Sequence, residues 1–221
     1  MLNNILSDAV RSNNFSFIER QEGIEIFERK VGEAKRFIII YETTALKNVD
    51  DLNELINNCV PQQLKQEPAF NKNTDLIVVY KLANLSDFKK LETDILAIEE
   101  DPYHFKKYVL YYIDGEENLL SKKTYEDLKL IISDQSLFEE YKNSPLSPSL
   151  YSIAARIYIK LPFLDLPKTP INLTPLNLQA QELVSELGHT DLDLAIQSIA
   201  LNDGQIDKLI QELINNEMEN I

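Results

Sequence analysis

The sequence has 221 residues and a formal net charge of −14 at pH 7, from 22 Lys and Arg against 36 Asp and Glu. This length is enough for one large domain, or for one domain with a small satellite. The acidic balance makes the chain a poor candidate for non-specific nucleic-acid binding, which requires a basic face, and it argues against docking on anionic lipid.

Few side chains are available for catalysis or metal binding. Cys59, His104 and His189 are the only Cys and His residues, too few for a four-ligand zinc site. The five Gly residues are too widely spaced for a GxGxxG turn or a P-loop. We therefore expect a non-enzymatic protein with no catalytic residue, no metal and no cofactor. The single Cys, the lack of a basic N-terminal stretch and the lack of an 18-residue apolar run predict a cytoplasmic location.

Three helices are predicted in the first 100 residues. Apolar residues at helical spacing indicate helices at 2–11, at 52–59 and at 86–98. Asp50 or Asp51 is the expected N-cap of the second helix.

Four strands are predicted between these helices. Runs rich in β-branched and aromatic residues lie at 15–18, 24–27, 37–41 and 75–80, and the first three form a meander. The last two runs are continuously apolar, which is typical of strands covered on both faces. Residues 105–113 fit either a helix opened by Pro102 or a strand from about 107, and their tyrosine-rich composition favours the strand.

The second half of the chain is predicted to be helical, with one proline-rich interruption. Residues 117–142 read as helical, and Ser149 is the expected cap of a helix at 150–160. Six of the nine Pro residues lie between 145 and 175, so 161–176 is expected to be an extended connector. Helical patterns follow at 177–187, 191–201 and 205–218.

The expected fold class is therefore α+β, with a mixed sheet of about four to five strands packed with helices. The expected organisation is a core domain at 1–160, the proline-rich connector at 161–176 and an acidic all-helical C-terminal module at 177–221.

The net charge is concentrated near the C-terminus. Residues 171–221 contain nine acidic residues and one basic residue, Lys208, which leaves 27 acidic and 21 basic residues in 1–170. Such a surface either keeps the protein soluble or docks on a basic surface of a partner protein. For the second reading, Asp191, Asp193 and Asp207 are the candidate partner-binding residues.

A second candidate partner site lies in the apolar, proline-stiffened segment 157–167. If this segment folds back on the core, it is a buried connector. If it is exposed, it is a preorganised patch for another protein. The candidate contact residues are Tyr158, Leu161, Phe163, Leu164 and Leu166.

The segment 99–107 gathers carboxylates, an imidazole and two lysines, including Glu99, Asp101, His104 and Lys107. General acid–base chemistry would need the carboxylates to converge on one point. Consecutive helical residues point about 100° apart, so these carboxylates do not converge by themselves. A helix end followed by a structured turn is the simpler interpretation.

The order helix, three strands, helix, strand resembles the core of restriction-endonuclease-like nucleases. Those enzymes bind Mg²⁺ through an Asp and a Glu-x-Lys on adjacent strands. Glu28 and Lys30 match Glu-x-Lys, but Glu19 or Glu22 would have to replace the missing Asp. This alternative predicts a Mg²⁺-dependent nuclease, or an inactive relative, with its site at Glu19, Glu28 and Lys30.

A family resemblance is carried by LETDILAIEEDPYHFKKYVLYY at 91–112 and by LYSIAARIYIKLPFL at 150–164. These stretches resemble the middle component of bacterial ABC-three-component systems, of which Lamassu-type anti-phage defence is the best-known example. The resemblance covers roughly residues 15–165. It implies a non-enzymatic accessory subunit that binds an SMC-like ATPase and an effector subunit, often a nuclease, and meets DNA only indirectly through the complex.

The leading hypothesis is thus a scaffold subunit of an anti-phage defence complex. A third alternative is an antitoxin-like inhibitor protein, whose acidic tail would cover a basic toxin surface.

Overall fold

The computed structural model describes residues 2–167 and 175–191, together with the single residues 194, 196, 208 and 210. The chain divides into two compact units, Met1–Thr169 and Pro170–Ile221. The division falls inside the predicted connector at 161–176.

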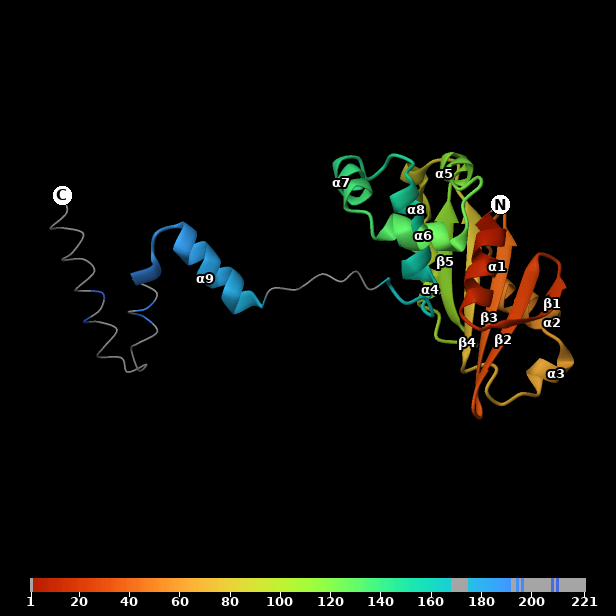
Figure 1. Cartoon of the computed structure of the whole chain (residues 1–221). Coiled ribbons are helices and arrows are strands. Elements are labelled where there is room, and N and C mark those ends of the chain that lie inside the picture. Colours follow the sequence, from red (N-terminus) through yellow and green to blue (C-terminus); the bar gives the residue numbers. More distant parts are fainter. Residues whose placement is uncertain are drawn as a thin grey trace. The chain divides into compact units, whose positions relative to one another are not determined.

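One five-stranded mixed sheet organises the first unit, with its strands in chain order (Figure 1). The strands β1, β2 and β3 are antiparallel, and β4 and β5 continue the sheet parallel to β3. The expected α+β fold with a mixed sheet is therefore confirmed, and residues 105–113 contain a strand. The bounds are β1 (Ser16–Gln21), β2 (Ile24–Val31), β3 (Ala34–Thr43), β4 (Thr74–Lys81) and β5 (Lys106–Tyr112).

The turn between β1 and β2 requires two residues in the left-handed region, Glu22 (φ 50°) and Gly23 (φ 78°). Consecutive positive φ angles match the twist of a two-residue hairpin, and Gly adopts them without strain. The predicted break between the first two strands thus has a physical cause.

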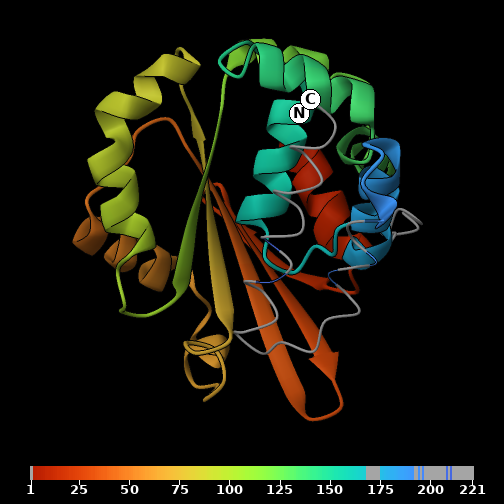
Figure 2. The same cartoon turned by 90° about the vertical axis from the view of Figure 1, so that its left-hand side faces the viewer.

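Helices cover both faces of the sheet (Figure 2). One face carries α1 (Leu2–Ser12), α5 (Asp114–Leu119), α6 (Tyr125–Ile132), α7 (Gln135–Asn143) and α8 (Leu150–Lys160). The other face carries α2 (Val49–Cys59), α3 (Gln62–Lys65), the short 3₁₀ helix η1 (Leu85–Asp87) and α4 (Phe88–Glu99).

Alternate residues of β3 supply two separate hydrophobic cores. Ile38 and Ile40 pack in the core beneath α1, α6 and α8, whereas Phe37 and Ile39 pack in the core beneath α2 and α4. Side chains alternate between faces along a strand, so a strand buried on both sides must be apolar at every position. The interpretation of 37–41 as a doubly covered strand is confirmed.

One sequence expectation about a helix end is wrong. Asn48, not Asp50 or Asp51, caps α2, because its Oδ1 accepts the Asp51 N–H at 2.9 Å. The stretch 117–142 is largely helical, as expected, and it is divided into the end of α5, then α6 and most of α7. The divisions arise because Lys122 has φ 68° and because Thr124 and Asp134 start new helices as side-chain caps. Helix α8 begins after Ser149, as expected.

In the second unit the structure describes α9 (Leu176–Glu186), which matches the pattern at 177–187. The expected helices at 191–201 and 205–218 lie mostly outside the described residues. Within the described parts of the chain, every helix is too short or too polar to cross a bilayer.

Candidate functional site

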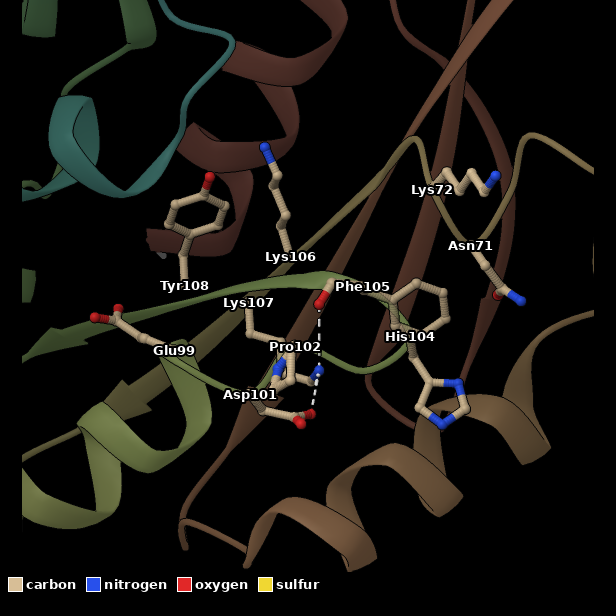
Figure 3. A pocket seen from close by; sticks show the side chains of 10 residues that line it. All are labelled: Asn71, Lys72, Glu99, Asp101, Pro102, His104, Phe105, Lys106, Lys107 and Tyr108. Atoms are coloured by element: carbon tan, nitrogen blue, oxygen red, sulfur yellow. Dashed lines mark hydrogen bonds and ion pairs between the residues drawn. The ribbon is translucent and has the colours of Figure 1, made fainter.

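A large pocket lies at the end of the sheet where β4 and β5 begin, and most of the segment 99–107 lines it (Figure 3). Its volume is about 730 Å³. Its lining residues are Asn71, Lys72, Glu99, Asp101, Pro102, His104, Phe105, Lys106, Lys107 and Tyr108. The pocket therefore brings several ionisable side chains of this segment to one place.

Lys107 links three groups in the wall of this pocket. Its side chain is fully buried, and its Nζ donates to Asp101 Oδ2 (2.7 Å) and to the carbonyls of Tyr103 (2.6 Å) and Phe105 (3.2 Å). An ammonium group has three protons, so all of its donors have partners. Lys107 thus fixes the turn between α4 and β5, in which His104 has φ 61°.

Asp101 is the anionic partner in this arrangement. Burial raises the pKa of Asp101, but hydrogen bonds from Lys107, Asn53 and the Tyr103 N–H outweigh burial and hold the pKa below its ordinary value. A carboxylate stabilised in its charged form is a poor general acid or base near neutral pH. The structured-turn interpretation of 99–107 agrees with this geometry.

Glu99 closes the outer edge of the sheet. Its Oε1 accepts the Val109 N–H at 2.7 Å and contacts Lys160 Nζ at 2.5 Å. Arg156 of α8 donates to the Tyr111 carbonyl of the same edge strand at 2.8 Å. Side chains on two helices therefore satisfy backbone groups of β5 that another strand would otherwise pair with.

A second buried ion pair joins Arg156 to Glu116, whose side chain has no exposure to solvent. Arg156 Nη2 also donates to Ser152 Oγ at 3.2 Å, and its guanidinium lies 4.7 Å from the centre of the Tyr111 ring. Burial raises the pKa of Glu116, against the lowering effect of Arg156 and the Ile113 N–H. The pair connects α5, α8 and β5, and it is enclosed by the core rather than open to a ligand.

The candidate partner site at 157–167 needs correction. Tyr158, Leu161, Phe163 and Leu164 are buried in the core beneath α1, α6 and α8, and of the five candidates only Leu166 is exposed. The segment folds back because Phe163 packs on Phe15, with ring centres 5.2 Å apart. The buried-connector alternative therefore describes Tyr158, Leu161, Phe163 and Leu164, whereas Leu166 and the neighbouring Ile159 are exposed.

The acidic candidates lie in the second unit. Asp191 is exposed, whereas Asp193 and Asp207 lie outside the described residues.

The alternative nuclease residues are only partly brought together. Lys30 Nζ lies 3.8 Å from Glu28 Oε2 on β2. Glu19 on β1 lies opposite Ile26, while Glu28 lies opposite Ser16. Glu22 is in the turn at the other end of these strands, where its Oε2 is 3.9 Å from Cys59 Sγ. In the part of the chain that the structure describes, no three Asp, Glu, His or Cys side chains are grouped so that they could hold a metal ion.

The sequence reasoning missed an exposed apolar stripe on α9. Leu176, Leu183 and Leu187 are 81%, 56% and 63% exposed. Positions separated by seven and four residues lie on one side of a helix. An isolated helix of this length is marginal in water, and its stability in proteins comes from burying such a stripe. The seven-residue spacing of Leu176 and Leu183 is the sequence signal that indicates this stripe.

A second missed feature is a basic pocket of about 420 Å³ beside the first one. Lys72 and Lys106 line both pockets. The pocket was hard to foresee, because its cations come from four segments that only the folded sheet brings together.

Comparison with known families gives one match. Residues 36–139 match the family model described as ABC-three component (ABC-3C) system Middle Component 1, a span that runs from β3 into α7. No curated protein and no solved structure matches the chain.

Proposed function

We propose that this chain, whose residues 36–139 match the Middle Component 1 family model of ABC-three component systems, joins the other components of its system by protein contacts. The family match is the observation that carries this proposal, because a middle component is an accessory subunit of such a system. In the finer form of the proposal, the partners are an SMC-like ATPase and a nuclease-type effector of a Lamassu-like anti-phage defence complex in the cytoplasm. The chain itself is non-enzymatic.

Helix α9 is the contact surface that we assign to this role. Its stripe of Leu176, Leu183 and Leu187 is exposed, and Glu182, Glu186 and Asp191 are nearby in the sequence. An amphipathic helix binds a partner by laying its apolar side in a groove, and flanking carboxylates favour a groove with a basic rim. The expected partner surface is therefore apolar at its centre and basic at its edges.

The test is co-expression of the tagged full chain with the proteins encoded by neighbouring genes, followed by pulldown and size-exclusion chromatography. Wild-type chain should elute with at least one neighbour. The double variant Leu183→Asp/Leu187→Asp should weaken this complex at least about a hundredfold, because burying each leucine contributes about 1.5–3 kcal/mol and every 1.4 kcal/mol is a factor of ten. The control is Leu178→Asp, which introduces the same side chain about 200° around the helix from Leu176.

Three outcomes would contradict parts of this proposal. If the wild-type chain elutes alone with every neighbour, the subunit role fails. If Leu178→Asp disrupts the complex as strongly as the double variant, the α9 stripe is not the contact surface. Salt-sensitive binding to a single small protein, without an ATPase, would favour the inhibitor alternative instead.

A further inference from the structure

A row of charged side chains crosses the end of the sheet where β3, β4 and β5 begin. Strand register places Arg29 on β2 opposite Arg36 on β3, and Asp75 on β4 opposite Lys106 on β5. Directly opposed residues share a face of the sheet. The loop before β4 adds Lys72 to the pocket formed there.

This pocket has a charge opposite to that of the chain as a whole. Among the residues that the structure describes, five cations and one carboxylate, Asp75, line it. The chain carries a net charge of −14. Cations concentrated in a concave site of an acidic protein create a local field that attracts an anion. The lining cations are Arg29, Lys35, Arg36, Lys72 and Lys106.

Three of these cations have partners that hold them in place. Arg36 donates from Nε (3.1 Å) and Nη2 (2.7 Å) to the same oxygen of buried Asp75, which leaves its remaining N–H groups available. Lys35 is paired with Glu67. The guanidinium of Arg29 donates to the Asn13 carbonyl at 3.2 Å.

Lys72 and Lys106 differ from these three. Both side chains are exposed, and within the described residues neither forms an ion pair or hydrogen bond (Figure 3). Lys106 lies opposite Asp75 in the sheet without pairing with it, and Arg36 binds one oxygen of the Asp75 carboxylate. Two ammonium groups at the pocket, beside a fixed guanidinium, are therefore free to bind an incoming anion.

We propose that this pocket binds a small phosphate-bearing ligand, either a nucleoside polyphosphate or an inorganic polyphosphate. Its volume of about 420 Å³ lies in the range of small-molecule sites. Lys and Arg together are the side chains that bind phosphate oxygens through charge-assisted hydrogen bonds. A nucleic-acid polymer fits less well, because it needs a basic stripe along its length and would be repelled by the remaining acidic surface.

The test is isothermal titration calorimetry of the full chain at low ionic strength, with four separate probes. These are pyrophosphate, magnesium-free ATP, adenosine and a 20-base-pair DNA duplex. We expect binding of ATP, pyrophosphate or both, and no binding of adenosine. Comparing the affinities for ATP and pyrophosphate then shows whether the site also contacts the nucleoside.

The decisive variant is Lys72→Gln/Lys106→Gln, which should weaken phosphate binding at least tenfold. Its control is Lys122→Gln/Lys123→Gln, which removes the same charge from exposed lysines outside the pocket and should leave affinity unchanged. All four lysines are exposed, so both variants should fold, and circular dichroism checks this. The proposal is overturned if neither phosphate probe binds, if only DNA binds, or if both variants weaken binding equally. None of these results depends on α9 or on complex formation.

Discussion

The buried pair of Glu116 and Arg156 predicts a large loss of stability when only the cation is removed. In Arg156→Met, the Glu116 carboxylate would stay in a site without solvent exposure and would lose its counter-charge. The Tyr111 carbonyl and the Ser152 hydroxyl would also lose a donor. Breaking one side of a buried pair costs about 3–5 kcal/mol. For a domain of this size, at about 2–4 °C per kcal/mol, that corresponds to a melting temperature lower by roughly 6–20 °C.

The pH dependence of this variant is a further part of the prediction. Burial already raises the pKa of Glu116 with Arg156 present, and removing the arginine should raise it more. A folded-state pKa above the unfolded value means that the variant gains stability as the pH falls and loses it as the pH rises through the folded pKa. The deficit relative to wild type should therefore be smaller at pH 5 than at pH 8.

Urea unfolding followed by circular dichroism at both pH values measures this effect. The matched control is the double variant Glu116→Leu/Arg156→Met, which removes both charges and should recover most of the lost stability. A cost below about 1 kcal/mol for Arg156→Met, or a double variant no more stable than the single one, would refute the reasoning, because the carboxylate would then be well solvated.

Three further predictions concern other parts of the core. Asp101→Asn should make the loss of stability at acid pH less steep. The pKa of Asp101 is lowered in the folded state, so its charged form stabilises the fold above the unfolded pKa of about 3.9, and this stability is lost as the pH falls through the folded-state pKa. A series of urea unfolding midpoints at different pH values tests this. Glu99→Ala should speed hydrogen exchange of the Val109 amide about tenfold or more, because a charge-assisted hydrogen bond is lost; an unchanged rate by NMR would contradict the edge-closing role. Ile39→Ala should cost about 2–5 kcal/mol, measured by urea unfolding, since Ile39 of β3 is fully buried in the core beneath α2 and α4. A cost below about 1 kcal/mol would mean that the core collapses around the substitution.

Much of the fold could be predicted from apolar periodicity. All five strands, the helix at 2–11 and the helix after Ser149 follow from residue patterns a few positions long. The stretch 117–142 could not be divided, because its breaks depend on the left-handed backbone at Lys122 and on a Thr124 cap that resembles any polar helix residue. Local propensity does not reveal which polar side chain becomes a cap.

The candidate sites were harder to predict than the fold. Phe163 and Leu164 have the same apolar character whether they face solvent or Phe15, so sequence alone left both alternatives open. The basic pocket depends on the register that places Arg29, Arg36 and Lys106 in one row. Their separation in sequence is too large for any local pattern to connect them.

The double covering of β3 has a consequence for how the sheet finds its alignment. A one-residue slip normally exposes the apolar side of a strand, and this cost selects the correct pairing. From Phe37 to Tyr41 both faces of β3 are apolar, so a strand shifted by one residue would still bury apolar side chains in each core. The correct alignment must then be selected at the polar end of the strand. There Arg36 forms an ion pair with Asp75, and the side-chain Nδ2 of Asn73 donates to the Lys35 carbonyl at 3.0 Å. The charged end of β3 thus sets the register in which β4 pairs with it.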